Sequence, residues 1–331
     1  MTADYDLTKF VPDAHRGRLV DARVRDHLAD SIATLFDALA DERVSVARAA
    51  RLLEQIRSGP ISPGVFGLYT DLVEAVLDED MARAGPLLQD FFAADFSRNE
   101  NLRIVNLTPG DLGGNQVERY RQLVNDDPAR PVHVAQMAQD DFRTIALVAQ
   151  EALALLDDAA PELAGEIRGL LRELVLVTSA EGAGLGGAST FYLWGAMFLN
   201  GPAHPDRVSI AEALAHESGH TLLFGLGMGS PLVENSPEER YPSPLRRDLR
   251  PLEGIVHATY VSARMCYALT RLLESDLLTK KERSAVLAAR DRDRGAYRNG
   301  LQVVSEHARW TPIGAAAFEA ARRYMSDASG L

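Results

Sequence analysis

Apolar residues in the first hundred positions recur at the spacing of a helix. A first stripe consists of Leu19, Val24, Leu28, Ile32, Leu35 and Leu39. A second stripe runs through residues 44–56, and the pattern continues through residues 66–92 with a break expected near Pro86. Spacings of three and four residues predict amphipathic helices, and proline interrupts them. We therefore predict a helical N-terminal region over residues 1–98.

Short runs of β-branched residues after position 99 predict strands. Such runs occupy residues 102–107, 132–137 and 174–178, and residues 190–199 form an aromatic-rich fourth run. Their lengths, and the proline and glycine residues that bound them, are typical of strands. Two segments between these runs, at 141–156 and 162–171, have helical spacing instead.

A glycine-rich segment separates the last two predicted strands. Gly182, Gly184 and Gly187 have the G-x-G-x-x-G spacing of a dinucleotide-binding turn. That turn requires a helix to begin at its last glycine, because the helix N-terminus holds the pyrophosphate. The residues after Gly187 predict a strand. A hairpin or lid loop is therefore favoured over nucleotide binding.

Helical spacing returns in the last third of the chain. The predicted helices cover residues 209–224, 251–274, 280–308 and 311–325, and Gly300 marks a candidate break in the third. Ser209 and Glu212 have the spacing of a capping box, in which each side chain satisfies a backbone N–H at the start of the helix. The helix at 209–224 is thus expected to begin at Ser209.

This helix carries the sequence His216-Glu217-Ser218-Gly219-His220. Residues four apart lie on one face of a helix, so His216 and His220 can bind one cation together. Glu217 lies about 100 degrees around the helix from His216. There a carboxylate can activate or orient a metal-bound water. The spacing predicts a metal-binding helix in preference to two solvated or core histidines.

A catalytic metal usually takes a third protein ligand and keeps one position open. Glu253 and His257 are the candidates, and they stand four residues apart on the helix predicted at 251–274. Glu253 would complete a His-His-Glu set of the kind found in zinc peptidases, whereas His257 would complete a set of three histidines. The spacing alone leaves both candidates open.

These elements predict an α+β fold that is mostly α-helical, with the metal-binding helix beside a small mixed or antiparallel sheet. Residues 99–331 would form the metal-binding catalytic domain. An apolar fraction of 46% and a charged fraction of 25% are ordinary for a folded globular protein. The sequence does not predict the oligomeric state.

Charge and cysteine content indicate which binding partners and which cellular compartment to expect. The 35 basic and 47 acidic residues give a net charge of −12, which opposes binding to nucleic acid or to an anionic membrane. Cys266 is the only cysteine, so no disulfide can form within the chain, and its apolar neighbours predict a packed core thiol. No signal peptide and no apolar run of 18 residues is evident. A cytoplasmic location is expected.

Residues 195–265 resemble the HExxH-motif peptide-modification proteins that are encoded beside ribosomally made peptide precursors. The likeness comprises the helix of the histidine motif and the run Arg250-Pro251-Leu252-Glu253-Gly254-Ile255-Val256-His257. The second run is the more specific part, because HExxH also occurs in many peptidases. The family commonly has glycine after the downstream histidine, and this chain has Ala258.

The resemblance implies an iron(II)- and 2-oxoglutarate-dependent oxygenase that hydroxylates a β-carbon in a peptide or a related amino-acid substrate, in natural-product biosynthesis. The family's ligand pattern falls on His216, His220 and His257. Such an enzyme needs dioxygen and a guanidinium for the distal carboxylate of 2-oxoglutarate. Arg250 and Arg264 are the candidates, although Arg264 could equally form a structural ion pair.

Residues 190–199 could serve as an edge strand that receives an extended peptide by strand addition. Tyr192 and Trp194 would then line the substrate channel, unless they belong to the core. The alternative function is a zinc-dependent metallopeptidase with Glu217 as the general base and Glu253 as the third ligand. Closed structural metal sites usually have four protein ligands, and the single cysteine disfavours such a site.

Overall fold

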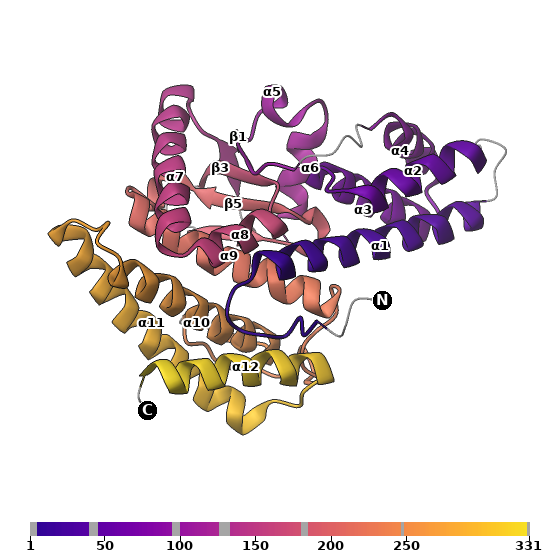
Figure 1. The fold of residues 1–331 in the computed structure, drawn as a ribbon. Coiled ribbons are helices and arrows are strands. Elements are labelled where there is room, and N and C mark those ends of the chain that lie inside the picture. Colours follow the sequence, from indigo (N-terminus) through magenta and orange to yellow (C-terminus); the bar gives the residue numbers. More distant parts are fainter. Residues whose placement is uncertain are drawn as a thin grey trace. The chain divides into compact units, whose positions relative to one another are not determined.

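The structure, a computed structural model, describes residues 5–39, 46–94, 100–125, 133–179, 185–245 and 248–329. The chain forms two compact units that are each discontinuous in sequence (Figure 1). Unit 1 comprises residues 1–17, 147–169 and 204–331, and unit 2 comprises residues 18–146 and 170–203. The division of the chain after residue 98 stays a prediction. Helices predominate and the sheet is small and mixed, which confirms the α+β class.

The N-terminal region is helical as predicted. Its helices are α1 (Ala14–Leu39), α2 (Val46–Ser58), α3 (Pro63–Leu77) and α4 (Met81–Ala93). The break expected near Pro86 is wrong, because α4 continues through this proline. The chain breaks earlier, at Glu79, which has a left-handed φ of 57°. Asp80 then starts α4 by accepting a hydrogen bond from the backbone N–H of Arg83.

The sheet of unit 2 has three parallel strands and two antiparallel ones. The strands are β1 (Arg103–Asn106), β2 (Val134–Gln136), β3 (Glu173–Ser179), β4 (Gly187–Ser189) and β5 (Ala196–Asn200). The order is β1-β3-β5-β4, and β2 pairs with the C-terminal half of β3. Val175 and Phe198 share one apolar cluster with Tyr120 of α6 (Gln116–Leu123). A short helix α5 (Pro109–Leu112) precedes α6.

The strand predicted at 190–199 is only partly correct. Residues Phe191–Leu193 form a 3-10 turn, in which the hydroxyl of Thr190 accepts a hydrogen bond from the N–H of Tyr192. Gly195, with a φ of +89°, redirects the chain before β5 begins. β5 lies between β3 and β4, so it is not the edge strand that peptide addition would need.

Of the glycine-rich segment, only the end lies within the described residues; residues 180–184 lie outside them. A strand, β4, begins at Gly187. The helix that a dinucleotide-binding turn requires at this position is therefore not there, in agreement with the preference for a hairpin or lid.

Unit 1 is built mainly from helices. They are the second part of α7 (Gln139–Ala159), α8 (Pro161–Leu170), α9 (Arg207–Gly227), α10 (Leu252–Glu274), α11 (Lys280–His307) and α12 (Pro312–Ser329). α10 packs against α9, α11 and α12. Figure 1 shows these four helices gathered together. A short hairpin of β6 (Tyr241–Pro242) and β7 (Leu249–Arg250) precedes α10. Among the described residues, none of the helices combines the length and apolar character that crossing a membrane would require.

Gly300 does not break the third helix of this group. α11 is continuous, and at Gly300 it approaches α10 too closely to leave room for a side chain. A Cβ atom at this position would lie 2.0 Å from the Oγ1 atom of Thr259. Because Thr259 donates its hydroxyl to the carbonyl of Ile255 at 2.7 Å, the side chain is held in place.

Gly300→Ala is therefore expected to destabilise the protein by about 1–3 kcal/mol, the usual cost of overpacking. Gly295→Ala is the matched control on the same helix, since a Cβ atom there would meet nothing within 4 Å. The control is expected to stabilise α11 by about 0.5–1 kcal/mol through helix propensity. Urea unfolding of both variants tests the pair. Equal effects would show that the α10–α11 contact is not close at Gly300.

Asp293 of α11 is a buried carboxylate beside Cys266. Its burial, together with the charge of Glu212, raises the pKa of Asp293 to about 7, although Arg292 opposes the shift from 3.5 Å away. Burial likewise raises the pKa of the Cys266 thiol to about 12. Cys266 is free and buried, which confirms the predicted core thiol.

The raised pKa of Asp293 makes stability depend on pH. The folded state binds more protons than the unfolded state between about pH 4 and 7, so the free energy of unfolding falls as the pH rises through this window. The side chain of Asp293→Asn cannot ionise. As the pH rises, the free energy of unfolding of this variant is therefore expected to increase relative to that of the wild type by about 1.4 kcal/mol per pH unit, with no further increase above about pH 7. Urea unfolding between pH 5 and 8 measures the difference. The exposed Asp291→Asn should track the wild type, and a parallel Asp293→Asn curve would contradict the burial of a charge.

Candidate metal centre

The helix that carries the histidine motif, α9, begins two residues earlier than predicted. Asp206 is the N-cap: its carboxylate accepts hydrogen bonds from the N–H groups of Val208 and Ser209 at 3.0 and 2.9 Å. Ser209 completes the capping box from the third helical position. The expected box of Ser209 with Glu212 is wrong, because Asp206 caps the helix from three residues earlier and so makes Ser209 the third helical residue. Glu212 instead forms an ion pair with Arg292.

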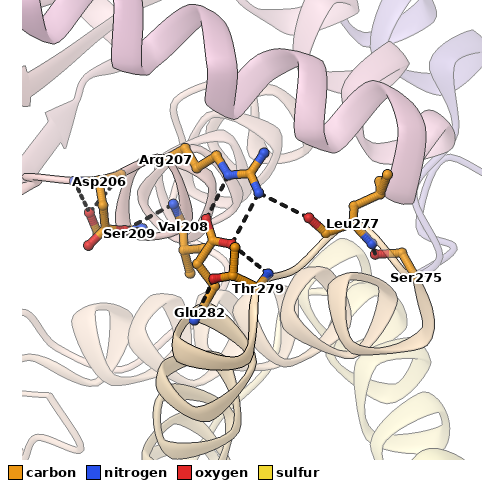
Figure 2. A network of polar contacts seen from close by, with 8 residues as sticks. All are labelled: Asp206, Arg207, Val208, Ser209, Ser275, Leu277, Thr279 and Glu282. Atoms are coloured by element: carbon orange, nitrogen blue, oxygen red, sulfur yellow. Dashed lines mark hydrogen bonds and ion pairs between the residues drawn. The ribbon is translucent and has the colours of Figure 1, made fainter.

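A second contact fixes the start of α9 against the start of α11. The Arg207 guanidinium donates to both carboxylate oxygens of Glu282, at 2.7 and 3.1 Å, and to the carbonyl of Leu277 at 3.0 Å (Figure 2). Glu282 also accepts from the N–H of Thr279, the N-cap of α11. These bonds hold the pKa of Glu282 at about 2. Because the pair is bidentate, it sets the rotation of α9 as well as its position.

Three imidazoles meet where α9 packs against α10. The Nε2 atoms of His216 and His220 are 3.2 Å apart, and the Nδ1 atoms of His220 and His257 are 3.0 Å apart. The rings of His220 and His257 are stacked with centroids 5.3 Å apart. Phe224, one turn after His220, lies against the His257 ring with a centroid separation of 5.2 Å. The structure thus brings the predicted third histidine to the pair on α9.

The separation within the first pair fits a shared metal ion. Two nitrogens bound to one tetrahedral ion at 2.0–2.1 Å lie about 3.3 Å apart. The three histidines nevertheless form a row, because His220 presents one nitrogen to His216 and the other to His257. Convergence of three nitrogens on one ion needs reorientation of at least one ring, and this torsion is a broad one. Accordingly, within the described residues no group of three His, Cys, Asp or Glu side chains is already arranged to hold a metal ion.

Glu217 is buried beside the first histidine. Its Oε1 atom lies 3.8 Å from the Nε2 atom of His216, and the side chain is 6% exposed. The His216 side chain is 25% exposed, so solvent reaches this end of the row. A carboxylate in this position can orient a water or take up a proton beside the histidine pair.

Glu253 contacts His257 rather than the pair on α9. Its Oε1 atom lies 3.2 Å from the Nε2 atom of His257, and its Oε2 atom accepts a hydrogen bond of 2.9 Å from the N–H of Leu232. Both carboxylate oxygens are therefore engaged by protein groups. This arrangement favours His257 over Glu253 as the third member of a metal site.

Arg250 and Arg264 differ in their surroundings. Arg250, at the end of β7, is 25% exposed and lies 3.6 Å from Asp248. Its Nε atom is 3.8 Å from the point where a side chain on Gly254 would begin, so it runs along the first turn of α10. Arg250 thus lies just before the first turn of α10, the turn that carries Glu253.

Arg264 is fully buried in an ion pair with Glu166 of α8. The same carboxylate accepts from the Nε atom of Arg16 at 2.7 Å, and Arg264 also donates to the carbonyl of Phe10 at 3.2 Å. We name Arg16, Glu166 and Arg264 the buried ion triad. Its geometry favours the structural interpretation of Arg264 over a role in binding 2-oxoglutarate.

The two predicted substrate residues belong to unit 2. Trp194 is 1% exposed, and its indole N–H donates to the carboxylate of Asp21 at 3.1 Å. This places Trp194 in the core of its unit, the alternative that the sequence left open. Tyr192 is 52% exposed on the 3-10 turn. Its role in a channel stays a prediction.

Sequence reasoning missed two participants at this centre, Phe224 and the N–H of Leu232, and it also missed the partner of Arg264. Phe224 fits the helical pattern, and its position four residues after His220 is the signal that could have placed it on the histidine face. The N–H of Leu232 and the carboxylate of Glu166 gave no signal, because a backbone donor has no sequence signature and Glu166 is far from its partners along the chain.

Comparison with known proteins does not assign a family. The sequence matches no protein-family model and no curated protein. The resemblance found in residues 195–265 therefore stays an expectation. The geometry of the histidine row is the main structural support for a function.

Proposed function

We propose that this chain is an iron(II)- and 2-oxoglutarate-dependent oxygenase that hydroxylates a β-carbon of a residue in a ribosomally made peptide or a related amino-acid substrate. His216, His220 and His257 would hold the metal. The observation that carries the proposal is the 3.0 Å contact between His220 and His257, two histidines on different helices. The resemblance of residues 195–265 to peptide-modification proteins supplies the reaction class.

The chain's own groups suit such a site. The three imidazoles are neutral ligands that leave positions for other ligands, as non-haem oxygenases require. Bound iron would supply activation of dioxygen. 2-Oxoglutarate would lose carbon dioxide to give succinate, with one oxygen atom entering succinate and the other entering the substrate as a hydroxyl group. Arg250 is the guanidinium best placed to pair with the distal carboxylate of 2-oxoglutarate, since Arg264 is already committed to Glu166.

A zinc-dependent peptidase is the second candidate, and Glu217 favours it. The buried carboxylate lies next to the histidine pair, where a peptidase of this motif has its general base. Against it, the second carboxylate expected as the third zinc ligand, Glu253, has both oxygens engaged by His257 and Leu232. The oxygenase proposal therefore has the stronger support.

Anaerobic purification followed by measurement of bound metal and of succinate release separates the two candidates. The oxygenase predicts succinate formation from 2-oxoglutarate that requires iron and dioxygen and is stimulated by a peptide substrate. Peptide cleavage with zinc in the absence of 2-oxoglutarate would support the peptidase instead. Arg250→Leu should raise the KM for 2-oxoglutarate far more than it lowers kcat, while Arg240→Leu, an exposed arginine of the preceding loop, serves as the control.

A further inference from the structure

We propose that the buried ion triad binds a small monovalent anion of the chloride class, held by its two arginines and by the hydroxyl of Tyr260. The proposal goes beyond the oxygenase function and does not depend on the histidine row. It starts from the hydrogen bonds of the triad. A guanidinium carries five N–H groups and no acceptor, and the carboxylate of Glu166 accepts from both Arg16 and Arg264.

Three buried donor groups around the triad have no acceptor among the described residues. They are the Nη1 group of Arg16, the Nε–H group of Arg264 and the hydroxyl of Tyr260. The two arginines are 0% exposed and the tyrosine is 1% exposed, so bulk solvent does not reach these groups. Leaving a buried donor without an acceptor is unfavourable, and a cluster of such donors indicates a bound water or ion.

Close packing keeps the two arginines where they are. A Cβ atom at Gly17, the residue after Arg16, would lie 2.7 Å from the carbonyl oxygen of Glu166. The first turn of α1 therefore packs directly against α8, and the Nε–H of Arg16 donates to Glu166 at 2.7 Å. Arg264 is held from another side, because its Nη1 group donates to the carbonyl of Phe10 at 3.2 Å. The remaining donors thus cannot turn toward solvent.

Tyr260 brings a neutral donor to the same place. It precedes Arg264 by four residues on α10, so the two side chains lie on one face of the helix. Burial raises the pKa of Tyr260, while the nearby charges of Arg16 and Arg264 act in the opposite direction. The phenol is therefore protonated and can donate. Its ring packs edge-on against Phe10 with centroids 5.6 Å apart, which fixes the position of the hydroxyl.

The charge of the site favours an anion over a water molecule. Two buried guanidinium charges face the one carboxylate charge of Glu166, which leaves a positive charge that needs a partner. Asp13 is a further acid group near Arg16, but it is half-buried, and its carboxylate accepts from the hydroxyl of Tyr5 and from the N–H of His15. Water carries no charge and has two lone pairs, whereas a halide ion accepts from several donors and balances the charge.

Such an anion would be a structural ligand of unit 1. Arg16 comes from the start of α1, and Arg264 and Tyr260 come from α10, so one ion would join two segments that are far apart in the sequence. A ligand that binds only the folded state stabilises it by mass action. The stability of the protein should therefore increase with the concentration of the anion.

Thermal unfolding in sodium chloride, with sodium gluconate added to keep the ionic strength constant, tests this inference. Gluconate is too large to be enclosed by three buried side chains. The Tm of the wild type is expected to rise by about 2–4 °C for each tenfold increase in chloride above its dissociation constant. Bromide should have the same effect. A Tm that is the same in chloride and in gluconate would overturn the proposal.

Tyr260→Phe removes one donor and keeps the ring. The chloride concentration at which the Tm begins to rise is expected to increase about 10- to 100-fold, the usual effect of losing a hydrogen bond to a charged group. Tyr297→Phe is the matched control, because the hydroxyl of Tyr297 on α11 is also buried without a partner among the described residues. After burial, the groups that affect the pKa of Tyr297 are Arg322, Cys266 and Glu319, and none of them belongs to the triad.

The control variant should keep the chloride dependence of the wild type. Equal shifts in the two variants, or no shift in Tyr260→Phe, would contradict a site at the triad.

A crystal grown in sodium bromide gives a readout that does not depend on stability. Its anomalous scattering is expected to show one ion within hydrogen-bonding distance of Arg16, Arg264 and Tyr260. A water molecule at this position would overturn the proposal. Bromide in the crystal without any effect of chloride on the Tm would also overturn it, because the ion would then bind only at the concentration used for crystals.

Discussion

Replacing His220 by alanine is expected to remove metal binding, with a loss of affinity well beyond the 10- to 100-fold typical of residues behind the ligands. His220 is the central ring of the row, within 3.2 Å of His216 and 3.0 Å of His257. Its removal therefore separates the two remaining rings as well as deleting one ligand. Metal content after anaerobic purification and titration with Co(II) measure the effect.

The other rings should show a graded response. His216→Ala and His257→Ala each leave a contacting pair, so their affinities are expected to fall between those of wild type and His220→Ala. His27→Ala, an exposed histidine of α1, controls for the general effect of losing an imidazole. Circular dichroism verifies the fold of each variant. Stoichiometric metal in the double variant of His216 and His220 would overturn the metal site.

Replacing Glu166 by glutamine is expected to cause the largest loss of stability, about 3–5 kcal/mol. The carboxylate is the common partner of Arg16 and Arg264, and all three side chains are fully buried. An amide cannot balance two guanidinium charges away from water, and breaking a buried pair typically costs this much. Urea unfolding measures the change.

Glu162→Gln is the matched control for this prediction. Glu162 is on the same helix, α8, but is exposed. Its replacement should change the free energy of unfolding by less than about 0.5 kcal/mol, as surface substitutions do. A Glu166→Gln variant as stable as the control would show that the buried ion triad does not hold unit 1 together.

Local patterns predicted most helices of the fold correctly. The stripe that begins at Leu19 and the helical spacing over residues 311–325 predicted α1 and α12 to within a few residues of their observed bounds, because the apolar face of each is continuous in sequence. The predicted element bounds were wrong where a single residue determined the start of a helix or the end of a strand. Asp206 replaced Ser209 as the N-cap, and Gly195 with its left-handed φ interrupted the expected strand at 190–199.

The sequence predicted only those residues of the candidate centre that lie on one helix, and not those that come from a second helix. His216 and His220 follow from a spacing of four, whereas the choice between Glu253 and His257 depends on how α9 and α10 pack. That packing is close at Gly219, where a Cβ atom would lie 3.0 Å from the Cγ1 atom of Val261. The role of Arg264 likewise depends on its ion pair with Glu166. Two residues so far apart in the sequence leave no periodic pattern from which their pairing could be predicted.

The order of segments in unit 1 has a consequence for folding. The ring of Phe10 packs against that of Tyr324 with centroids 4.7 Å apart, and Arg16 pairs with α8. Every residue of unit 2, by contrast, precedes His204. During synthesis, all residues of the sheet emerge before unit 1 is complete, so the sheet can form early. Phe10 can contact Tyr324 only after α12 has been synthesised. Contacts of such wide sequence separation slow folding, so completion of unit 1 is expected to be the late step.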